Sequence, residues 1–297
     1  MSSIKSRETL ATEEKNAIMP ATLYLVATPI GNLSDLSERA IKVLREVDFI
    51  AAEDTRNSGN LLSYLGIQKP MVSYFEHNKR ERGIQIADRL AAGESCALVT
   101  DAGTPAISDP GEDLVSLCAE RGIHVTSIPG PCAGIVALTL SGLPTGRFTF
   151  EGFLSVNKAE RRRRLDELKG ETRTMLFHEA PHKLIATLDD LSEVFGGTRR
   201  IALCRELTKR NEEILRMTLA EAVSYYAENQ PRGEYVLVLE GADPSAAAEH
   251  PFWEDMSIRE HVLYHESQGL DRKAAIKAAA KDRGVPKNDV YQEMINS

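Results

Sequence analysis

Short apolar runs alternate with amphipathic stretches over the first half of the chain. The apolar runs occupy 23–27, 47–53, 96–101 and 123–129, with a weaker fifth at 71–75, and the stretches with helical spacing occupy 36–47, 81–93 and 112–122. Apolar runs separated by helices are typical of a parallel sheet that is covered on both faces. The pattern predicts an α/β domain with a doubly wound open sheet over residues 21–144.

From about residue 148 the pattern changes. Strand-like runs lie at 148–154, 172–180, 199–207 and 234–241, and only two helical segments, at 181–196 and 218–229, lie among them. Fewer helices per strand indicate a mixed or antiparallel sheet. We therefore expect a second α/β domain over 145–242, joined to the first near 141–147, where Gly and Pro break the helix that begins at Cys132.

The two ends of the chain differ from this pattern. Residues 1–20 are polar and lack the apolar stretch of a signal peptide, so a loose tail is expected there. After a small-residue linker, residues 250–297 predict helices at 257–265, 271–284 and 286–295, with Asp271 as N-cap and Gly284 as a stop. Two helices joined by so tight a turn form a helix-turn-helix candidate. The alternative is a packing appendage that only covers the core.

Composition narrows the function classes. The chain has 297 residues and a formal net charge of −8, so it has no global basic field for nucleic acid. Any RNA contact must therefore come from a local patch, and the one dense basic patch is Lys158, Arg161, Arg162, Arg163 and Arg164. An exposed, solvated helix face is the alternative interpretation of this patch. No apolar run is long enough to span a membrane.

The four cysteines lie far apart without the spacing of a metal site. Three of them stand in apolar or small-residue runs, which favours buried thiols in a reducing compartment over a disulfide framework. We expect a cytoplasmic protein without a bound metal. The motifs GxxxxGK[ST], GxGxxG after the first strand and GxSxG are also absent from the sequence, which excludes several common catalytic classes.

The strongest functional signal is the segment VTDAGTPAISDPG at 99–111. It follows a predicted strand, and ligands bind beyond the carboxyl ends of strands in open α/β sheets. Gly103 lets backbone approach a ligand, while Pro105 and Pro110 stiffen the loop. A rigid structural turn is the alternative, but the segment has more special residues than a turn needs.

Other predicted strands end in comparable residues. The first ends in a turn at 28–32, the second in Glu53-Asp54-Thr55-Arg56, and the fifth in IPGPCAG. In the second half, 179–182 and the charged segment 204–213 also follow strands. Each signal is weak by itself, but together they predict a cleft at one rim of the fold.

Taken in order, these segments resemble a known family. LYLVATPIGNLSDLS, AEDTR, ALVTDAGTPAISDPG, IPGPCA, EGFLSVNKAERRRRL, HEAPHKL and CRELTKRNEE are similar to the bacterial ribosomal RNA small subunit methyltransferase I family, within the tetrapyrrole-methylase superfamily. The resemblance covers about residues 23–241, and the helical end resembles an extension found in many members. It implies two α/β domains with S-adenosylmethionine in the cleft between them, usually in a homodimer.

The resemblance also implies an activity: 2′-O-methylation of a cytidine ribose in the decoding region of 16S rRNA, within the small ribosomal subunit. By the same resemblance, the residues expected to bind the cofactor are Pro29, Asp101, Gly103, Thr104, Pro105, Ala133, His178, Glu179, Ala180, Glu234 and Tyr235. The chain departs from the family at two positions, since His178 stands where a Tyr is more common and Lys183 where an Arg is more common.

Methyl transfer to a ribose hydroxyl requires alignment and a group that takes the hydroxyl proton, but no metal. The candidate bases are Glu53, Asp54 and Glu179, with Arg56 and Lys209 placed to orient the base or a phosphate.

Two other functions compete with this one. A methyltransferase acting on a porphyrin-like small molecule would have a roomy, apolar acceptor cleft and no need for the basic patch. A nucleic-acid-binding module without catalysis would use the loop at Asp101 only as a scaffold.

Overall fold

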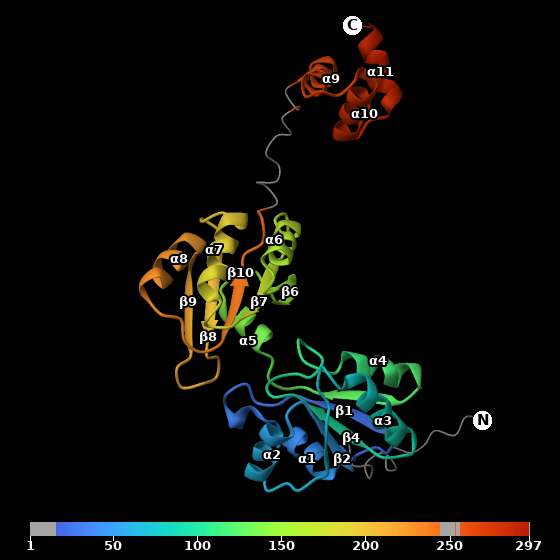
Figure 1. Ribbon diagram of the computed structural model, residues 1–297, viewed down its shortest axis with the longest axis vertical. Coiled ribbons are helices and arrows are strands. Elements are labelled where there is room, and N and C mark those ends of the chain that lie inside the picture. Colours follow the sequence, from blue (N-terminus) through green and yellow to red (C-terminus); the bar gives the residue numbers. More distant parts are fainter. Residues whose placement is uncertain (1–15, 244–252, 254–255, 297) are drawn as a thin grey trace, which may run out of the picture. The chain divides into compact units, whose positions relative to one another are not determined.

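The computed structural model describes residues 16–243, 253 and 256–296. Most of the expected tail, residues 1–15, and most of the linker after the second domain therefore lie outside the described residues. The described residues divide into two compact units at Gly241, and Figure 1 labels most of their helices and strands.

The first sheet is wholly parallel, as the sequence predicts. Its five strands run in the order β3-β2-β4-β1-β5. They are β1 (Thr22–Val26), β2 (Phe49–Ala52), β3 (Met71–Ser73), β4 (Cys96–Val99) and β5 (His124–Ile128). The central strands β2 and β4 are buried along their whole length, which explains why they read as unbroken apolar runs.

Helices cover both faces of this sheet. One buried cluster contains side chains of α1 (Glu38–Glu46) and α2 (Thr55–Tyr64), and another contains those of α3 (Lys79–Ala91) and α4 (Glu112–Glu120). The sequence does not predict α2. Its residues TRNSGNLLSY are mostly polar and bury only Ser58 and Leu62, so the helical period is weak.

The second sheet is mixed and runs in the order β6-β7-β10-β8-β9. Only β6 and β7 are parallel. The strands are β6 (Phe148–Phe153), β7 (Thr174–Glu179), β8 (Arg200–Arg205), β9 (Glu213–Thr218) and β10 (Tyr235–Leu239). The sequence does not predict β9, a partly buried edge strand that forms a hairpin with β8 and carries Glu213 and Arg216. Charged residues on an edge strand obscure the apolar alternation.

Three helices cover one face of the second sheet, and a fourth covers the other. The first three are α6 (Lys158–Glu167), α7 (Leu184–Phe195) and α8 (Leu219–Glu228). The fourth is α5 (Ala133–Leu140), which follows β5 of the first sheet but packs against the second (Figure 1). Ala137 and Leu138 lie in one buried cluster with Leu176 and Val236. The chain thus crosses to the second sheet before the expected linker.

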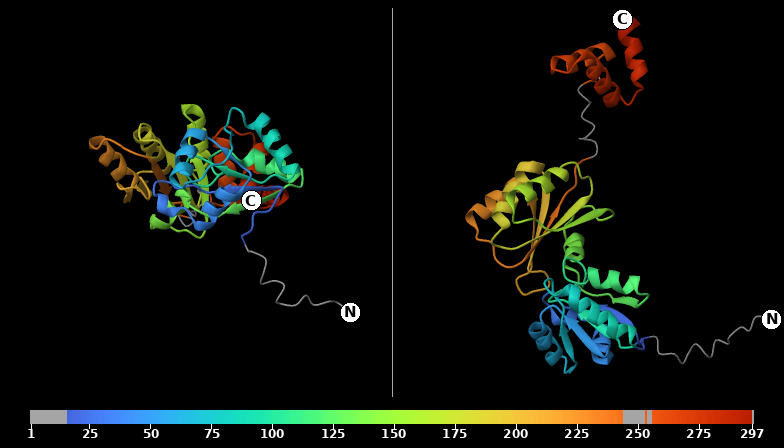
Figure 2. Two further views of the ribbon diagram at one scale, coloured as in Figure 1. Left: turned by 90° about the horizontal axis from the view of Figure 1, so that it is seen from below. Right: turned by 45° about the vertical axis from the view of Figure 1, so that its right-hand side comes forward.

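The second unit holds α9 (Ile258–Ser267), α10 (Arg272–Arg283) and α11 (Lys287–Asn296), seen also in Figure 2. It has its own small core of Val262, Ala275, Ile276, Ala279, Ala280 and Val290. The predicted caps are confirmed: the Asp271 side chain accepts from the Ala274 amide, and Gly284 is left-handed. Among the described residues, no helix is both long and apolar enough to cross a membrane.

Candidate functional site

Three loops at the carboxyl ends of the first sheet are held together by hydrogen bonds. The amide of Thr28 donates to the Gly103 carbonyl at 2.9 Å, and the Gly103 amide donates back at 3.0 Å. The Thr104 hydroxyl donates to the carbonyl of Pro131 at 2.9 Å. The ends of β1, β4 and β5 therefore meet at one rim.

The loop that follows β4 holds an unusual backbone conformation. Ala106 (φ 67°) and Ser108 (φ 65°) are left-handed although neither is glycine. At Gly111 (φ 148°) a Cβ atom would come within 3.0 Å of the Ala106 nitrogen. Such conformations are costly and cluster at functional sites, so the surrounding contacts fix this loop in shape before any ligand arrives.

A cleft of about 390 Å³ opens between this rim and the second sheet. Its volume falls within the range of small-molecule sites, roughly 300–1,000 Å³. Seven of the residues singled out from the sequence line the cleft: Ala133, His178, Glu179, Ala180, Lys209, Glu234 and Tyr235. Gly103 and Thr104 line a small pocket of about 40 Å³ that shares Ile30, Ala102, Asp109, Ala133 and His178 with the cleft.

The other expected cofactor residues lie beside the cleft. Pro29 and Asp101 line a separate pocket of about 290 Å³ on the α2 side. Pro105 is buried within the loop. Ile30 and Ala102, the next residues along, line the cleft itself, so the two loops form a wall shared by cleft and pocket.

His178 is the most distinctive polar group in the cleft. Its ring lies edge-on to Phe150 and Phe153, each with a centroid 5.3 Å away. Burial lowers the pKa of the imidazole, which keeps the ring neutral. Its Nε2 atom is buried without a hydrogen-bond partner in the described part of the chain. Because buried polar atoms are normally paired, this atom is suited to contact a bound ligand.

Lys209 lies at the contact between the two domains. Its ammonium group binds Glu206 at 2.9 Å and Glu234 at 2.8 Å. A Cβ atom on Gly31 would lie 2.3 Å from the Lys209 side chain, so only glycine allows this close approach. Lys209 therefore joins the loop after β1 to the far wall of the cleft, and its charge is shared by two carboxylates.

Two of the three candidate bases are already committed to other contacts. Asp54 caps α2 through the Arg56 amide and pairs with the Arg56 guanidinium, which lowers its pKa. Glu179 is buried, accepts from the Thr187 hydroxyl at 2.6 Å and accepts from the Ala180 amide at 2.8 Å. These contacts occupy the carboxylate oxygens that a base would need to leave free.

Glu53 and Asp109 form a different kind of pair. Burial raises the pKa of Glu53, and the neighbouring carboxylates of Asp101 and Asp54 add to the rise. Burial also raises the pKa of Asp109 to about 6, with repulsion from Glu53 and Asp101. Both residues line a cavity of about 420 Å³, and Asp109 also lines the cleft. The sequence pattern does not single out Asp109, although it lies in the loop at 99–111, because its burial depends on the fold.

The basic patch on α6 is largely neutralised by neighbouring carboxylates. Arg161 pairs with Asp190 at 2.6 Å. Arg162 pairs with Asp166 and Glu193, and Arg164 with Glu151 and Glu167. Within the described ranges, Lys158 and Arg163 form no ion pair and are exposed.

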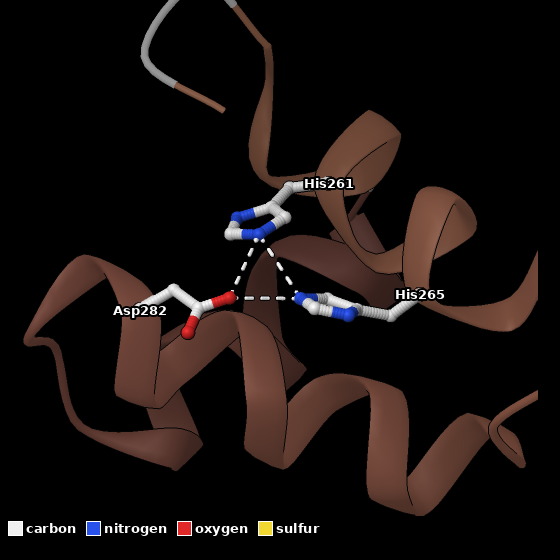
Figure 3. A group of neighbouring side chains, drawn as sticks. All are labelled: His261, His265 and Asp282. Atoms are coloured by element: carbon white, nitrogen blue, oxygen red, sulfur yellow. Dashed lines mark hydrogen bonds and ion pairs between the residues drawn. The ribbon is translucent and has the colours of Figure 1, made fainter. Parts of the chain in front are cut away.

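A second cluster of titratable side chains lies in the helical unit (Figure 3). The Nε2 atoms of His261 and His265 and an oxygen of Asp282 lie 2.9–3.2 Å from one another. The Nε–H of Arg283 donates to Nδ1 of His261 at 3.1 Å, and the Trp253 ring stacks on the same imidazole. Since Nδ1 accepts, the neutral ring carries its proton on Nε2, which suits a hydrogen-bond network better than a metal ligand.

Comparison with known proteins connects this geometry to a family. Residues 22–223 match the family of Tetrapyrrole (Corrin/Porphyrin) Methylases. The chain is 49% identical over 270 residues to a protein of Halalkalibacterium halodurans named ribosomal RNA small subunit methyltransferase I, covering 91% of this chain and 93% of that protein. Proteins of the same name from Bacillus subtilis and Pseudomonas aeruginosa are each 46% identical, covering 91% and 92% of this chain and 92% and 96% of theirs.

Solved structures with the same fold include uroporphyrin-III C-methyltransferase from Thermus thermophilus complexed with S-adenosyl homocysteine, at TM-score 0.52 and 18% identity, covering 74% of this chain and 97% of that one. Another is cobalt precorrin-4 methyltransferase, at TM-score 0.55 and 15% identity, covering 74% and 95%. At such identities the likeness establishes the fold, whereas the closer relatives cover nearly the whole chain. The chain therefore belongs to the ribosomal RNA small subunit methyltransferase I family of the tetrapyrrole methylases.

Proposed function

We propose that this protein transfers the methyl group of S-adenosylmethionine to the ribose 2′-oxygen of a cytidine in the decoding region of 16S rRNA. The observation that carries the proposal is identity of 42–49% over at least 91% of the chain to proteins named ribosomal RNA small subunit methyltransferase I. The proposed substrate is the small ribosomal subunit, and the proposed location is the cytoplasm.

The cleft residues fit the proposed cofactor. The unpartnered Nε2 atom of His178 offers a polar contact, and the close approach at Gly31 keeps the two walls together. The residues that would hold the cofactor are Ala133, His178, Glu179, Ala180, Glu234 and Tyr235, with Pro29, Asp101, Gly103, Thr104 and Pro105 forming the adjoining wall. When bound, S-adenosylmethionine supplies an electrophilic methyl group on a sulfonium sulfur.

The protein's own part is to align the ribose and accept its hydroxyl proton. Correct alignment can contribute roughly 7–11 kcal/mol to such a reaction. For the proton we propose the Glu53–Asp109 pair, because both carboxyls line one cavity and Asp109 also borders the cleft. Their raised pKa values bring them nearer to neutral pH than an ordinary carboxyl, which favours general base catalysis.

RNA contact on α6 is proposed for Lys158 and Arg163 in particular. The other three arginines of the patch, Arg161, Arg162 and Arg164, would have to leave carboxylate partners before they could bind phosphate. Free cations bind phosphates without this loss.

A homodimer is also part of the proposal. Edge strand β6 and the loop after it expose Phe148, Phe150, Phe153 and Val156, with exposed fractions of 38, 38, 60 and 75%. An edge strand that carries large apolar side chains is suited to pairing with another copy of the chain. Sedimentation of the wild type and of Val156→Glu would test it: the variant should shift toward the monomer, and an unchanged mass would contradict the proposed surface.

Mapping ribose methylation in rRNA tests the function directly. Cells without the gene should lose one 2′-O-methyl group from the 16S decoding region, and restoring the gene should return it. An unchanged map would refute the proposal. If the acceptor were a porphyrin-like molecule instead, purified protein would methylate that molecule and leave small subunits unmodified.

A further inference from the structure

The pocket of about 290 Å³ on the α2 side shares only Pro29 and Asp101 with the proposed cofactor residues, and cofactor binding does not explain the rest of its lining. It lies between the loop after β1 and helix α2, and its lining includes Pro29, Asn57, Asn60, Tyr64 and Asp101. We propose that this pocket binds the base of an unstacked pyrimidine nucleotide of the RNA substrate, an inference that rests on the proposed function.

The side chains of α2 suit a nucleobase. Asn57, Asn60 and Tyr64 recur at intervals of three and four residues, so they share one face of the helix. Each Asn side chain is exposed and makes no hydrogen bond to the described residues, so its amide is free to donate and to accept. Bases of single-stranded RNA are commonly recognised by hydrogen bonds of this kind.

Tyr64 supplies an aromatic surface. Its side chain is 70% exposed, although a large aromatic residue is more often at least half buried. No aromatic ring among the described residues stacks on it. Unstacked bases are typically held by stacking on such rings.

The inner end of the pocket also has an unused polar group. Thr100 is only 2% exposed and lines the pocket, yet its hydroxyl has no hydrogen-bond partner in the part of the chain that the structure describes. A buried hydroxyl without a partner is uncommon in proteins. It would be satisfied by a polar atom of the bound nucleoside.

The charge of the pocket favours a neutral group. Its lining contains no Lys or Arg, and its only charged member is the Asp101 carboxylate. A phosphate or a tetrapyrrole with several carboxylates would be repelled there, whereas a base and its ribose are uncharged.

The position of the pocket brings its occupant close to the proposed chemistry. Thr28 and Gly103 are joined by two hydrogen bonds, so the loops at 28–31 and 100–103 form one wall. Pro29 and Asp101 face the pocket, and the next residues face the cleft. The Asp101 amide donates to Glu53 at 3.4 Å, so one lining residue of the pocket contacts a proposed proton acceptor.

Steady-state methylation of small subunits that lack the modification tests the pocket. Tyr64→Ala should lower kcat/KM roughly five- to a hundred-fold, as loss of base stacking does elsewhere. Tyr64→Phe keeps the ring and should retain most of the wild-type kcat/KM. Asn60→Ala, which removes a hydrogen-bonding amide, should lower kcat/KM. Ser63→Ala, at an exposed neighbouring position of α2, is the matched control and should match the wild type.

Calorimetry with S-adenosylhomocysteine separates the acceptor side from the donor side. All four variants should bind it with wild-type affinity, and their circular dichroism should be unchanged. The pocket proposal is overturned if Tyr64→Ala and Asn60→Ala retain wild-type kcat/KM on an active enzyme, or if they lose cofactor affinity in step with activity. A wild-type protein that does not methylate small subunits would instead refute the proposed function.

Discussion

The carboxylates around the cleft differ in what already binds them. Glu179 and Asp54 each accept hydrogen bonds from neighbours in the same chain. In the described part of the chain no group donates a hydrogen bond to the Asp109 side chain, and burial raises its pKa to about 6. Residue type and position in the sequence do not reveal this difference, because it depends on which donors the fold brings into contact.

Asp109→Asn should lower kcat by about 10²–10⁴-fold, since the amide cannot accept the proton. In the wild type, the rate should fall as pH drops below about 6, because a base must be ionised and the Asp109 carboxyl becomes protonated there. Rate–pH profiles of both proteins on small subunits measure the effect. Ser116→Ala, at an exposed position of α4, is the control; a full-rate Asp109→Asn enzyme would exclude this carboxyl as the base.

Glu179→Ala should lower stability as well as remove a proposed cofactor contact. It removes the acceptor of the Thr187 hydroxyl, which is 3% exposed, and an unpaired buried group typically costs about 1–3 kcal/mol. Chemical denaturation should show a lower free energy of unfolding. Glu179→Gln keeps one acceptor oxygen and should recover part of the loss; equal stability of all three proteins would argue against this structural role.

At the scale of the elements, the buried parts of the fold were predictable and the polar parts were not. All five strands of the first sheet follow from apolar runs, because β2 and β4 are covered on both faces. Helix α2 and strand β9 escaped prediction, since their stability comes from Asp54 capping and from pairing with β8. Of the candidate site, the loop at 99–111 stands out in the sequence, whereas the pairing of Lys209 with two carboxylates depends on tertiary contacts.

The helix pair α9–α10 should be sensitive to acid. Burial lowers the pKa of His261, and the positive charges of His265 and Arg283 add to this, while Asp282 opposes it. A histidine whose folded pKa lies below its unfolded value takes up more protons when unfolded. The stability it contributes is therefore complete above about pH 6.5 and is lost as pH falls below that value.

Hydrogen exchange of the full-length protein at pH 7.5 and pH 5.5, followed by nuclear magnetic resonance, measures the stability of α9 and α10. Amides of α9 and α10 should exchange faster at the lower pH, after correction for intrinsic rates, while β2 and β4 stay protected. His261→Gln should be less stable at pH 7.5 but nearly independent of pH. Equal protection of α9 at both pH values in the wild type would contradict the role of His261 in acid sensitivity.

At the scale of the whole molecule, the two units divide the proposed tasks. Every residue that lines the cleft lies within residues 1–241. The helical unit exposes Lys273, Lys277 and Lys281 on one side of α10, at intervals of four residues, and they form no ion pair among the described residues. A stripe of free cations of this kind is suited to phosphate contacts.

A protein that ends at Gly241 should bind S-adenosylhomocysteine as the full chain does but should bind small subunits more weakly. Its affinity for subunits should also depend less steeply on salt, because fewer cations displace counterions. Calorimetry and subunit binding at several salt concentrations measure the two effects. The triple variant Lys273→Ala, Lys277→Ala, Lys281→Ala should likewise bind subunits with a weaker dependence on salt. If neither protein changes the salt dependence of binding, the helical unit does not contact RNA.

The position of helix α5 limits how the chain can be divided. By sequence it continues the first sheet, yet its apolar face lies against β7 and β10 of the second. A break in the chain near residue 145 would therefore leave each fragment with an exposed core surface, and a break before Cys132 would keep α5 with the sheet it covers. Two separately expressed fragments should reassemble more readily when the chain is divided before Cys132 than when it is divided near residue 145. The second folding unit therefore begins about a dozen residues before the second domain that the sequence pattern predicts.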